Sequence, residues 1–180
     1  MVNINGIYKA MPMSRVILRE KAKQIRKLLG LDKKMYFDII FFIEIILTII
    51  DPEFRYEIIE KGKMPDCYAL MLPEENIMKI REDVYDAAVN GDGRHRLTLA
   101  HELGHYFLHN SGTVQFARID GSNKPKPYED PEWQASAFAA ELLIPYDLIK
   151  EDMSVSEIVK KCGVSYQAAE YQLNKKINRN

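Results

Sequence analysis

The apolar residues in the first quarter of the chain recur at the spacing of an α-helix. Ser14 is a suitable N-cap for a helix that runs to Leu29 and ends at Gly30. A second apolar run over residues 34–50 predicts another helix, which ends before Asp51-Pro52. Helices are therefore expected over residues 14–50, after an irregular lead-in. The apolar stripe expected to face inward in the first helix is Ile17, Leu18, Ala22, Ile25, Leu28 and Leu29.

The pattern then changes from helical to alternating. The first alternating run places Phe54, Tyr56 and Ile58 on one face of a strand. Two further runs are joined by a connection that begins at Pro73, which is typical of a β-hairpin turn. A small, mostly antiparallel sheet is the expected result. Its strands are predicted at residues 54–58, 68–72 and 77–81, within a region that spans 54–82.

The second half of the chain returns to helical periodicity. Asp130 as N-cap and Pro131 at the first helical position predict a helix that stops before Pro145. We therefore expect an α+β domain over residues 1–150, with a C-terminal helix pair over 151–180 packed on it. The other predicted elements are a helix at 83–89, a long apolar helix within 94–109, a loop over 110–130 with a strand at 114–118, and helices at 154–162 and 165–177.

Composition and charge exclude several classes of protein. The 180 residues are 47% hydrophobic and 28% charged, which is typical of a globular protein with a core. The net charge of −1 gives no electrostatic footprint for nucleic acid. Cys67 and Cys162 form no disulfide framework, so a reducing cytoplasm is expected. The N-terminus has no signal-peptide pattern. The apolar run over 35–50 contains Asp38 and Glu44 and is shorter than the roughly 20 residues of a membrane span, so no membrane association is expected.

The chemistry is concentrated in a His-Glu-x-x-His motif. His101 and His105 are four residues apart, so on a helix they project from the same face and can bind a single ion. Glu102 lies about 100° further round, where a general base for metal-bound water belongs. The alternative is a chance match made by ordinary histidines. The surrounding helix is strongly apolar, however, and burying these groups without an ion would be costly. The motif therefore predicts a metal site.

A third protein ligand is expected, because catalytic zinc usually has three and keeps one position for water. Glu132 is the best candidate, since Ala135 and Ala139 follow it on the same face and would let the two helices approach closely. Glu141 is the competitor, although it looks like the outer edge of its helix. On spacing alone, Glu132 is equally well explained as a first-turn glutamate stabilised by the helix dipole.

Two segments resemble the ImmA/IrrE family of zinc-dependent endopeptidases: Arg96-Leu-Thr-Leu-Ala-His-Glu-Leu-Gly-His105, and the helix that runs from Glu132 to Pro145. Ser136 stands where that family usually has Asn or Asp. The resemblance implies a zincin-like fold with metal-site helices over 94–145. It also implies that His101, His105 and Glu132 bind Zn²⁺ and that Glu102 is catalytic. Mn²⁺ or Fe²⁺ also suit two histidines and a carboxylate.

The expected reaction is peptide hydrolysis, in which water on the zinc, activated by Glu102, attacks the carbonyl. The oxyanion needs a further donor, and Tyr128, His109 and Tyr106 all stay open. His109 suits a contact behind a ligand or with substrate, or is simply a histidine at the helix end. The substrate is expected to bind extended along an edge of the sheet.

Members of the resembled family often act on helix-turn-helix repressors of phages and mobile elements. The expected function is therefore a cytoplasmic endopeptidase that cleaves or inactivates such a repressor and so derepresses those genes. One alternative is a non-proteolytic regulator that uses the same fold to bind a repressor or another protein. Another is a DNA-binding tail, because residues 155–169 have helix-turn-helix spacing. The would-be recognition helix opens without Arg or Lys, so no direct nucleic-acid contact is expected.

Overall fold

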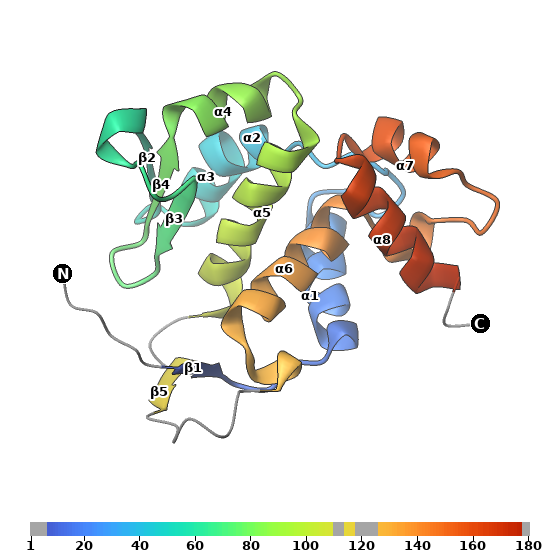
Figure 1. Ribbon diagram of the computed structural model, residues 1–180, viewed down its shortest axis with the longest axis horizontal. Coiled ribbons are helices and arrows are strands. Elements are labelled where there is room, and N and C mark those ends of the chain that lie inside the picture. The colour runs from blue at the N-terminus through green and yellow to red at the C-terminus, as the bar shows by residue number, and fades with distance from the viewer. Residues whose placement is uncertain (1–6, 110–113, 118–125, 178–180) are drawn as a thin grey trace.

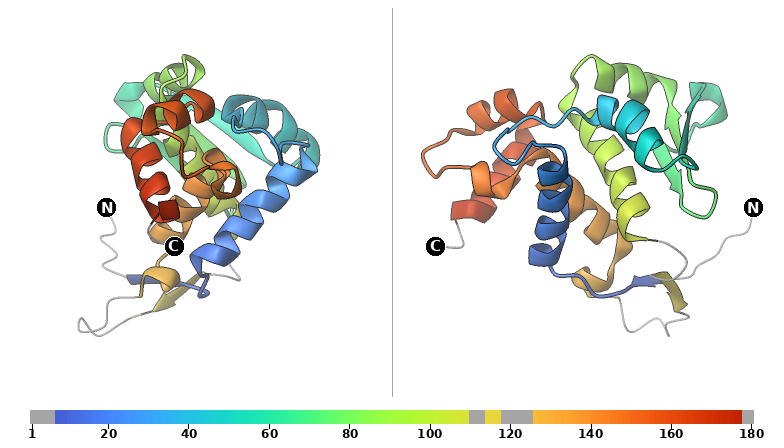
Figure 2. Two further views of the ribbon diagram at one scale, coloured as in Figure 1. Left: turned by 90° about the vertical axis from the view of Figure 1, so that its right-hand side faces the viewer. Right: turned by 180° about the vertical axis from the view of Figure 1, so that it is seen from behind.

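Two helices at the centre of the computed structural model, α5 (Gly93–Leu108) and α6 (Pro131–Leu143), pack against each other along their lengths (Figure 1). A third helix, α1 (Arg15–Leu28), packs on another side of α6 (Figure 2). The structure describes residues 7–109, 114–117 and 126–177. The predicted α+β fold class is confirmed.

Local capping explains where the two central helices begin. The Asp92 carboxylate accepts hydrogen bonds from the backbone N–H groups of Arg94 and His95 at the start of α5. The Asp130 carboxylate accepts from the N–H of Glu132, and Pro131 occupies the first position of α6, as predicted. Both helices therefore start at residues that the sequence specifies locally.

The start of α1 was predicted correctly, and so was most of its inward stripe: Leu18 and Ala22 are fully buried, and Ile25 and Leu29 pack against the core. The prediction was wrong at Ile17 and Leu28. Ser14 caps the helix through the N–H of Ile17. Ile17 is 46% exposed and Leu28 is 87% exposed, whereas Arg15 and Arg26 are buried. The reason is that α1 faces polar groups of α6: the Arg26 guanidinium donates to the Leu142 carbonyl at 2.6 Å. Long cations therefore occupy positions where aliphatic residues were expected.

The second predicted helix, over 34–50, begins later and has a different geometry. Asp38 accepts from the N–H of Phe41, so the helix starts only after this cap, and Phe37 before it is fully buried. The middle of the helix is π-helical. A threonine hydroxyl, Thr48 Oγ1, contacts the carbonyls of Glu44 and Ile45 at the end of the π segment. The segments are α2 (Ile39–Phe41), the π segment η1 (Phe42–Leu47) and α3 (Thr48–Ile50).

The predicted hairpin is confirmed as β3 (Ala69–Leu72) and β4 (Ile77–Arg81), which pair antiparallel. The preceding strand, β2 (Arg55–Ile59), lies on the other side of β4 and runs parallel to it, so this sheet is mixed. Ile58 is 42% exposed, because the outer face of β2 is not covered at that point. Helix α4 (Glu82–Val89) follows β4 directly, close to its predicted position.

The lead-in before Ser14 was predicted to be irregular, and that prediction is wrong. It contains β1 (Ile7–Ala10), which pairs antiparallel with β5 (Val114–Ala117), a strand that the sequence did predict. This ribbon lies at the end of α5 and α6 away from α4 (Figure 1).

The C-terminal helices α7 (Val155–Cys162) and α8 (Tyr166–Ile177) match their predicted positions. Ser154 and Glu157 form a reciprocal capping box at the start of α7. Gly163 separates the helices with φ of +63°, a left-handed conformation that favours glycine. The part of the chain that the structure describes also contains short 3₁₀ turns: η2 (Lys61–Lys63), η3 (Pro127–Glu129) and η4 (Tyr146–Leu148).

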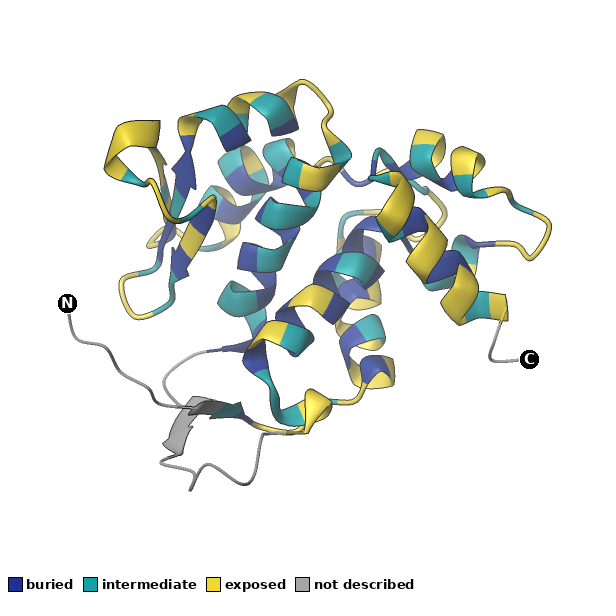
Figure 3. Cartoon of the chain, in the orientation of Figure 1, coloured by how far each residue is buried: buried dark blue, intermediate teal, exposed yellow. Residues whose placement is uncertain are grey.

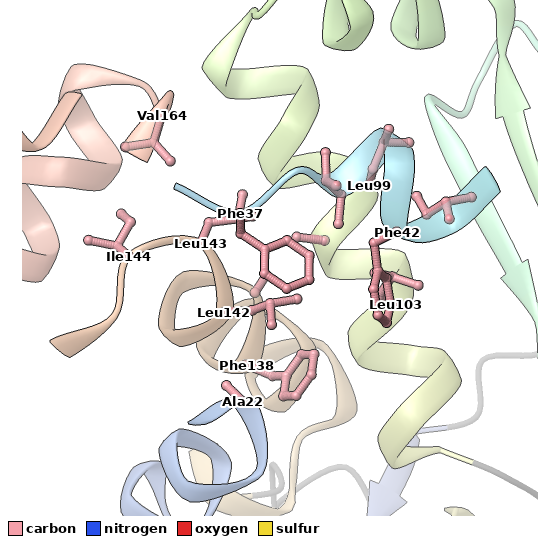
Figure 4. Packing of buried hydrophobic residues seen from close by; sticks show 14 of the residues in the cluster. Ala22, Phe37, Phe42, Leu99, Leu103, Phe138, Leu142, Leu143, Ile144 and Val164 are labelled. Carbon is pink, nitrogen blue, oxygen red and sulfur yellow. The ribbon is translucent and has the colours of Figure 1, made fainter. Parts of the chain in front are cut away.

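One hydrophobic cluster extends over α1, α2, the π segment, the sheet and helices α4–α8, and Figure 3 shows the buried residues on these elements. Figure 4 shows Phe37 and Phe42, which precede and open the π segment, packed among residues of α5 and α6. Ile158 and Ala169 extend the same cluster into α7 and α8. Across the described ranges, no helix has the length and apolar character needed to cross a bilayer. The core residues shared by α5 and α6 include Leu99, Leu103, Phe138 and Leu142.

Candidate metal centre

Three side chains from α5 and α6 converge on one point. The Nε2 atoms of His101 and His105 lie 3.0 Å apart. The Glu132 carboxylate approaches both: Oε2 is 3.1 Å from Nε2 of His101, and Oε1 is 3.3 Å from Nε2 of His105. The structure therefore brings together the two histidines of the motif and the glutamate favoured as third ligand.

The donor set fits a divalent ion of the zinc type. Tetrahedral ligands at about 2.0–2.1 Å from zinc are separated from one another by about 3.4 Å. The separations of 3.0, 3.1 and 3.3 Å between these ligand atoms are close to that value. The two histidines also hold the pKa of the Glu132 carboxyl well below its usual range, first through the contact with His101. The carboxylate is thus ready to bind a cation.

A glycine permits the close approach of the two helices. A Cβ at Gly104, between the two histidines, would lie 2.8 Å from the Cα of Ala135 and 2.9 Å from its carbonyl oxygen. Ala135 and Ala139 are both fully buried. The expectation that small residues let α6 lie close to α5 is confirmed at Ala135, and this contact limits how far Glu132 stands from the histidines.

A buried hydrogen-bond chain determines which ring nitrogen of His105 faces the cluster. The Gln134 Nε2 group donates to the carbonyls of Met11 at 2.8 Å and Tyr128 at 2.7 Å. Its Oε1 must therefore accept from Nε2–H of His109, 3.0 Å away. Burial lowers the pKa of His109, so its ring is neutral and Nδ1 is an acceptor. That atom accepts a hydrogen bond from Nδ1–H of His105, 3.0 Å away.

It follows that Nε2 of His105 carries a lone pair and points at the cluster. Metal-binding histidines commonly donate their second ring N–H to a partner that fixes the tautomer. His109 has this position behind a ligand, which is one of the roles that the sequence left open for it. Gln134 was not identified from the sequence, because nothing local distinguishes it from a solvent-exposed glutamine.

His101 has a simpler partner. Its Nδ1 lies 3.1 Å from the hydroxyl of Ser136, one turn after Glu132 on α6. Ser136 is the position where the resembled family usually has Asn or Asp. A hydroxyl can accept the Nδ1 proton as an amide oxygen would, so the substitution preserves the orientation of the ligand.

Glu102 lies beside the cluster but is held by the sheet. It is 8% exposed, and its Oε2 accepts a hydrogen bond of 2.7 Å from the backbone N–H of Met71 on β3. Burial raises the pKa of this carboxyl, and the Met71 N–H opposes that shift. A carboxyl with a raised pKa next to a metal-ligand set is suited to taking up and releasing a proton.

The two tyrosines proposed as oxyanion donors differ in their contacts. The Tyr106 hydroxyl donates to the Asp51 carboxylate at 2.5 Å, so it serves the packing of α5 on the turn after α3. Tyr128 is 39% exposed, and the Lys126 ammonium lies over its ring. Neither hydroxyl has a hydrogen bond to the three-ligand cluster among the described residues.

The interpretation of Glu141 as an outer-edge residue is wrong. Its side chain is fully buried and forms ion pairs with Arg15 at 2.8 Å and Arg19 at 3.0 Å. The error arose because α1 covers the side of α6 that carries Glu141. Glu141 is engaged by the arginines of α1 and is not among the three side chains that cluster at the site.

Comparison with protein families agrees with the geometry. The Peptidase M78 family model, described as the IrrE N-terminal-like domain, matches residues 81–174. No curated protein matches the chain. The matched segment runs from the end of β4 into α8 and contains the complete three-ligand cluster and Glu102. The chain therefore belongs to the Peptidase M78 family, the ImmA/IrrE group of metallopeptidase type.

Proposed function

We propose that the protein is a zinc-dependent endopeptidase that inactivates a helix-turn-helix repressor. The observation that carries the proposal is the cluster of His101, His105 and Glu132 with the buried carboxylate of Glu102 beside it. Two neutral imidazoles and one carboxylate would leave the site of a divalent ion with a net positive charge. When bound, such an ion supplies polarisation of a peptide carbonyl and lowers the pKa of water.

The protein side chains have separate tasks in this reaction. Glu102 takes the proton of the attacking water and delivers it to the leaving amine. Because Met71 holds Oε2, we assign Oε1 to the proton transfer. His109 and Tyr106 are engaged by the partly or fully buried groups Gln134 and Asp51, whereas the Tyr128 hydroxyl contacts the side chain of the exposed Lys126. Because that contact is the easiest of the three to exchange, we assign the donation to the oxyanion to the hydroxyl of Tyr128.

The repressor target comes from the family resemblance and from the absence of an electrostatic footprint for DNA. With a net charge of −1, the chain is suited to a protein substrate rather than to the operator itself. Cleavage of the repressor, in the cytoplasm, would release the genes that it silences.

The first experiment measures metal content by mass spectrometry. Wild type should contain about one zinc per chain, Glu132→Ala should contain much less, and Glu102→Gln should keep its metal because Glu102 is not a ligand. The same measurement decides between zinc, manganese and iron. Wild type that neither contains metal as purified nor takes up added zinc would contradict the proposal.

The second experiment incubates zinc-loaded wild type and Glu102→Gln with the repressor encoded nearest to the gene. Wild type should produce discrete fragments and loss of operator binding, whereas Glu102→Gln should produce neither. If wild type abolishes operator binding without cleavage, and Glu102→Gln does so equally well, the protein is a non-proteolytic regulator that binds the repressor.

A further inference from the structure

A cavity of about 700 Å³ adjoins the metal centre. One wall consists of residues from α5 and α6, and the other of residues from the C-terminal helix α8, which lies across from them (Figures 1 and 2). Its volume lies within the range of about 300–1,000 Å³ that is typical of ligand sites. The residues that give it an apolar lining are Leu97, Trp133, Ala137, Ala140, Ala168 and Tyr171.

The cavity is continuous with the candidate site. His101, whose Nε2 belongs to the ligand cluster, is also a lining residue, and so is Ser136, which orients the ring of His101. A peptide whose carbonyl reached the cluster would therefore have a neighbouring side chain at the mouth of the cavity. No separate docking motion is required for both contacts to form.

The charges of the cavity favour an apolar occupant next to the cluster. Arg15 lines the cavity, but its guanidinium is bonded to Glu141 and to Gln172 Oε1 at 2.7 Å, so its charge is compensated. Arg94 is exposed in the first turn of α5, about 10 Å along the helix axis from His101. Beside the polar side chains of His101 and Ser136, the lining consists largely of aromatic and aliphatic side chains, and the small alanines leave its space open.

We propose that this cavity is the subsite for a large apolar side chain, aromatic or long aliphatic, next to the bond that is cleaved. Helix α8 is then part of the substrate site rather than a remote appendage. This inference rests on the proposed peptidase function, and it deepens that function by naming a class of substrate residue.

The test compares two metal-directed probes by calorimetry on the zinc-loaded full chain. Acetohydroxamate has no side chain that could enter the cavity, whereas 3-phenylpropanohydroxamate has a phenyl group. Wild type should bind the phenyl probe at least 10-fold more tightly. Ala140→Phe on α6 and Ala168→Phe on α8 fill the cavity from opposite walls. Each should abolish the preference while keeping zinc and acetohydroxamate binding.

A matched control is Ala87→Phe, because Ala87 is also half-buried but lies on α4, away from the cavity. It should keep the full preference for the phenyl probe. Equal binding of the two probes by wild type, or a preference that survives both filling substitutions, would overturn the subsite and leave the peptidase intact. Failure of wild type to bind either hydroxamate would overturn the peptidase proposal and the subsite with it. Because Ala140→Phe and Ala168→Phe fill the cavity independently, the test still gives a result if one of them does not fold.

Discussion

Helix α6 carries two buried polar networks that differ in kind. Near its start, Gln134 holds His109, which in turn holds His105, through uncharged groups only. Near its end, Glu141 is ion-paired with Arg15 and Arg19 of α1. In the first network each hydrogen bond has a defined donor and acceptor, whereas the second is held by the attraction between a carboxylate and two guanidinium groups.

The difference shows two uses of polarity inside one small core. A directional chain of neutral hydrogen bonds fixes the tautomer and tilt of a ligand, which charge alone cannot do. A buried ion cluster holds helices in register, and its members become costly when a partner is lost. The ion cluster extends to α8 through Gln172, which accepts from Arg15 and donates to the Ile144 carbonyl at 3.2 Å. Stability and metal binding should therefore respond separately to substitutions at the two ends of α6.

The largest effect on stability is expected from Glu141→Gln. It leaves the buried guanidinium of Arg15 and the partly buried one of Arg19 without their carboxylate, which should lower the free energy of unfolding by about 3 kcal/mol. Zinc affinity of the folded protein should stay unchanged. Urea denaturation and a competition assay with a chromophoric chelator measure the two quantities. Glu60→Gln removes an exposed ion pair with Lys63 and should cost less than about 1 kcal/mol. A similar loss of unfolding free energy in Glu141→Gln and Glu60→Gln would show that the buried ion cluster is no more important for stability than an exposed ion pair.

Gly104→Ala should lower both the stability of the fold and its zinc affinity. The added Cβ meets backbone atoms of Ala135, so α6 must move away from α5. Overpacking of this kind costs about 1–3 kcal/mol, whereas replacing glycine by alanine in a helix gains about 1 kcal/mol. Because the added Cβ meets backbone atoms, we expect the cost to be larger than the gain and the free energy of unfolding to fall. Zinc affinity should also fall, because Glu132 moves with α6. The control substitution Gly62→Ala, where no heavy atom lies within 4 Å of the new Cβ, should keep the zinc affinity and should not destabilise the chain. Unchanged zinc affinity in Gly104→Ala would show that the helix spacing does not set the site.

The same substitution at two buried glutamines gives the sharpest comparison. Gln134 and Gln172 are both fully buried, one in each network. Gln134→Leu removes the acceptor that fixes His109, and zinc affinity should fall about 10–100-fold. Gln172→Leu should destabilise the chain but keep the zinc affinity of the folded protein. The assay is chelator competition under conditions where both variants are folded. Equal losses of affinity would mean that the two networks do not act separately.

The smallest effect is expected from Ser136→Ala. The lost contact to Nδ1 of His101 is worth about 0.5–1.5 kcal/mol, so zinc affinity should fall by about 2–10-fold. Ser136→Asn restores an acceptor of the type usual in the resembled family and should recover the affinity. Recovery by Asn but not by Val would show that hydrogen bonding, rather than packing, is responsible.

Local signals made much of the fold predictable. The Asp130–Pro131 start of α6, the Ser14 cap of α1 and the β3–β4 hairpin each depend on residues a few positions apart. The His101–His105 pair follows from helical spacing in the same way. Glu132 as third ligand needed the family resemblance, because its distance from the histidines depends on how two helices pack.

What failed depended on contacts between distant parts of the chain. Arg15 and Glu141 are 126 positions apart, so neither the burial of the arginine nor that of the glutamate has a local signature. The pairing of β1 with β5 is likewise non-local. The helix starts after Asp38 rather than at residue 34. The apolar run favours the earlier start, whereas the Asp38 cap and the burial of Phe37 in the core favour the later one.

The turn between α7 and α8 lies directly against Gly93, the first residue of α5. A Cβ at Gly93 would lie 2.2 Å from the carbonyl carbon of Val164 and 2.4 Å from the amide nitrogen of Ser165. These are backbone atoms, so any larger residue at position 93 requires this turn to move, and α8 with it. Because α8 forms one wall of the cavity, a substitution at position 93 would change the shape of the cavity without lining it.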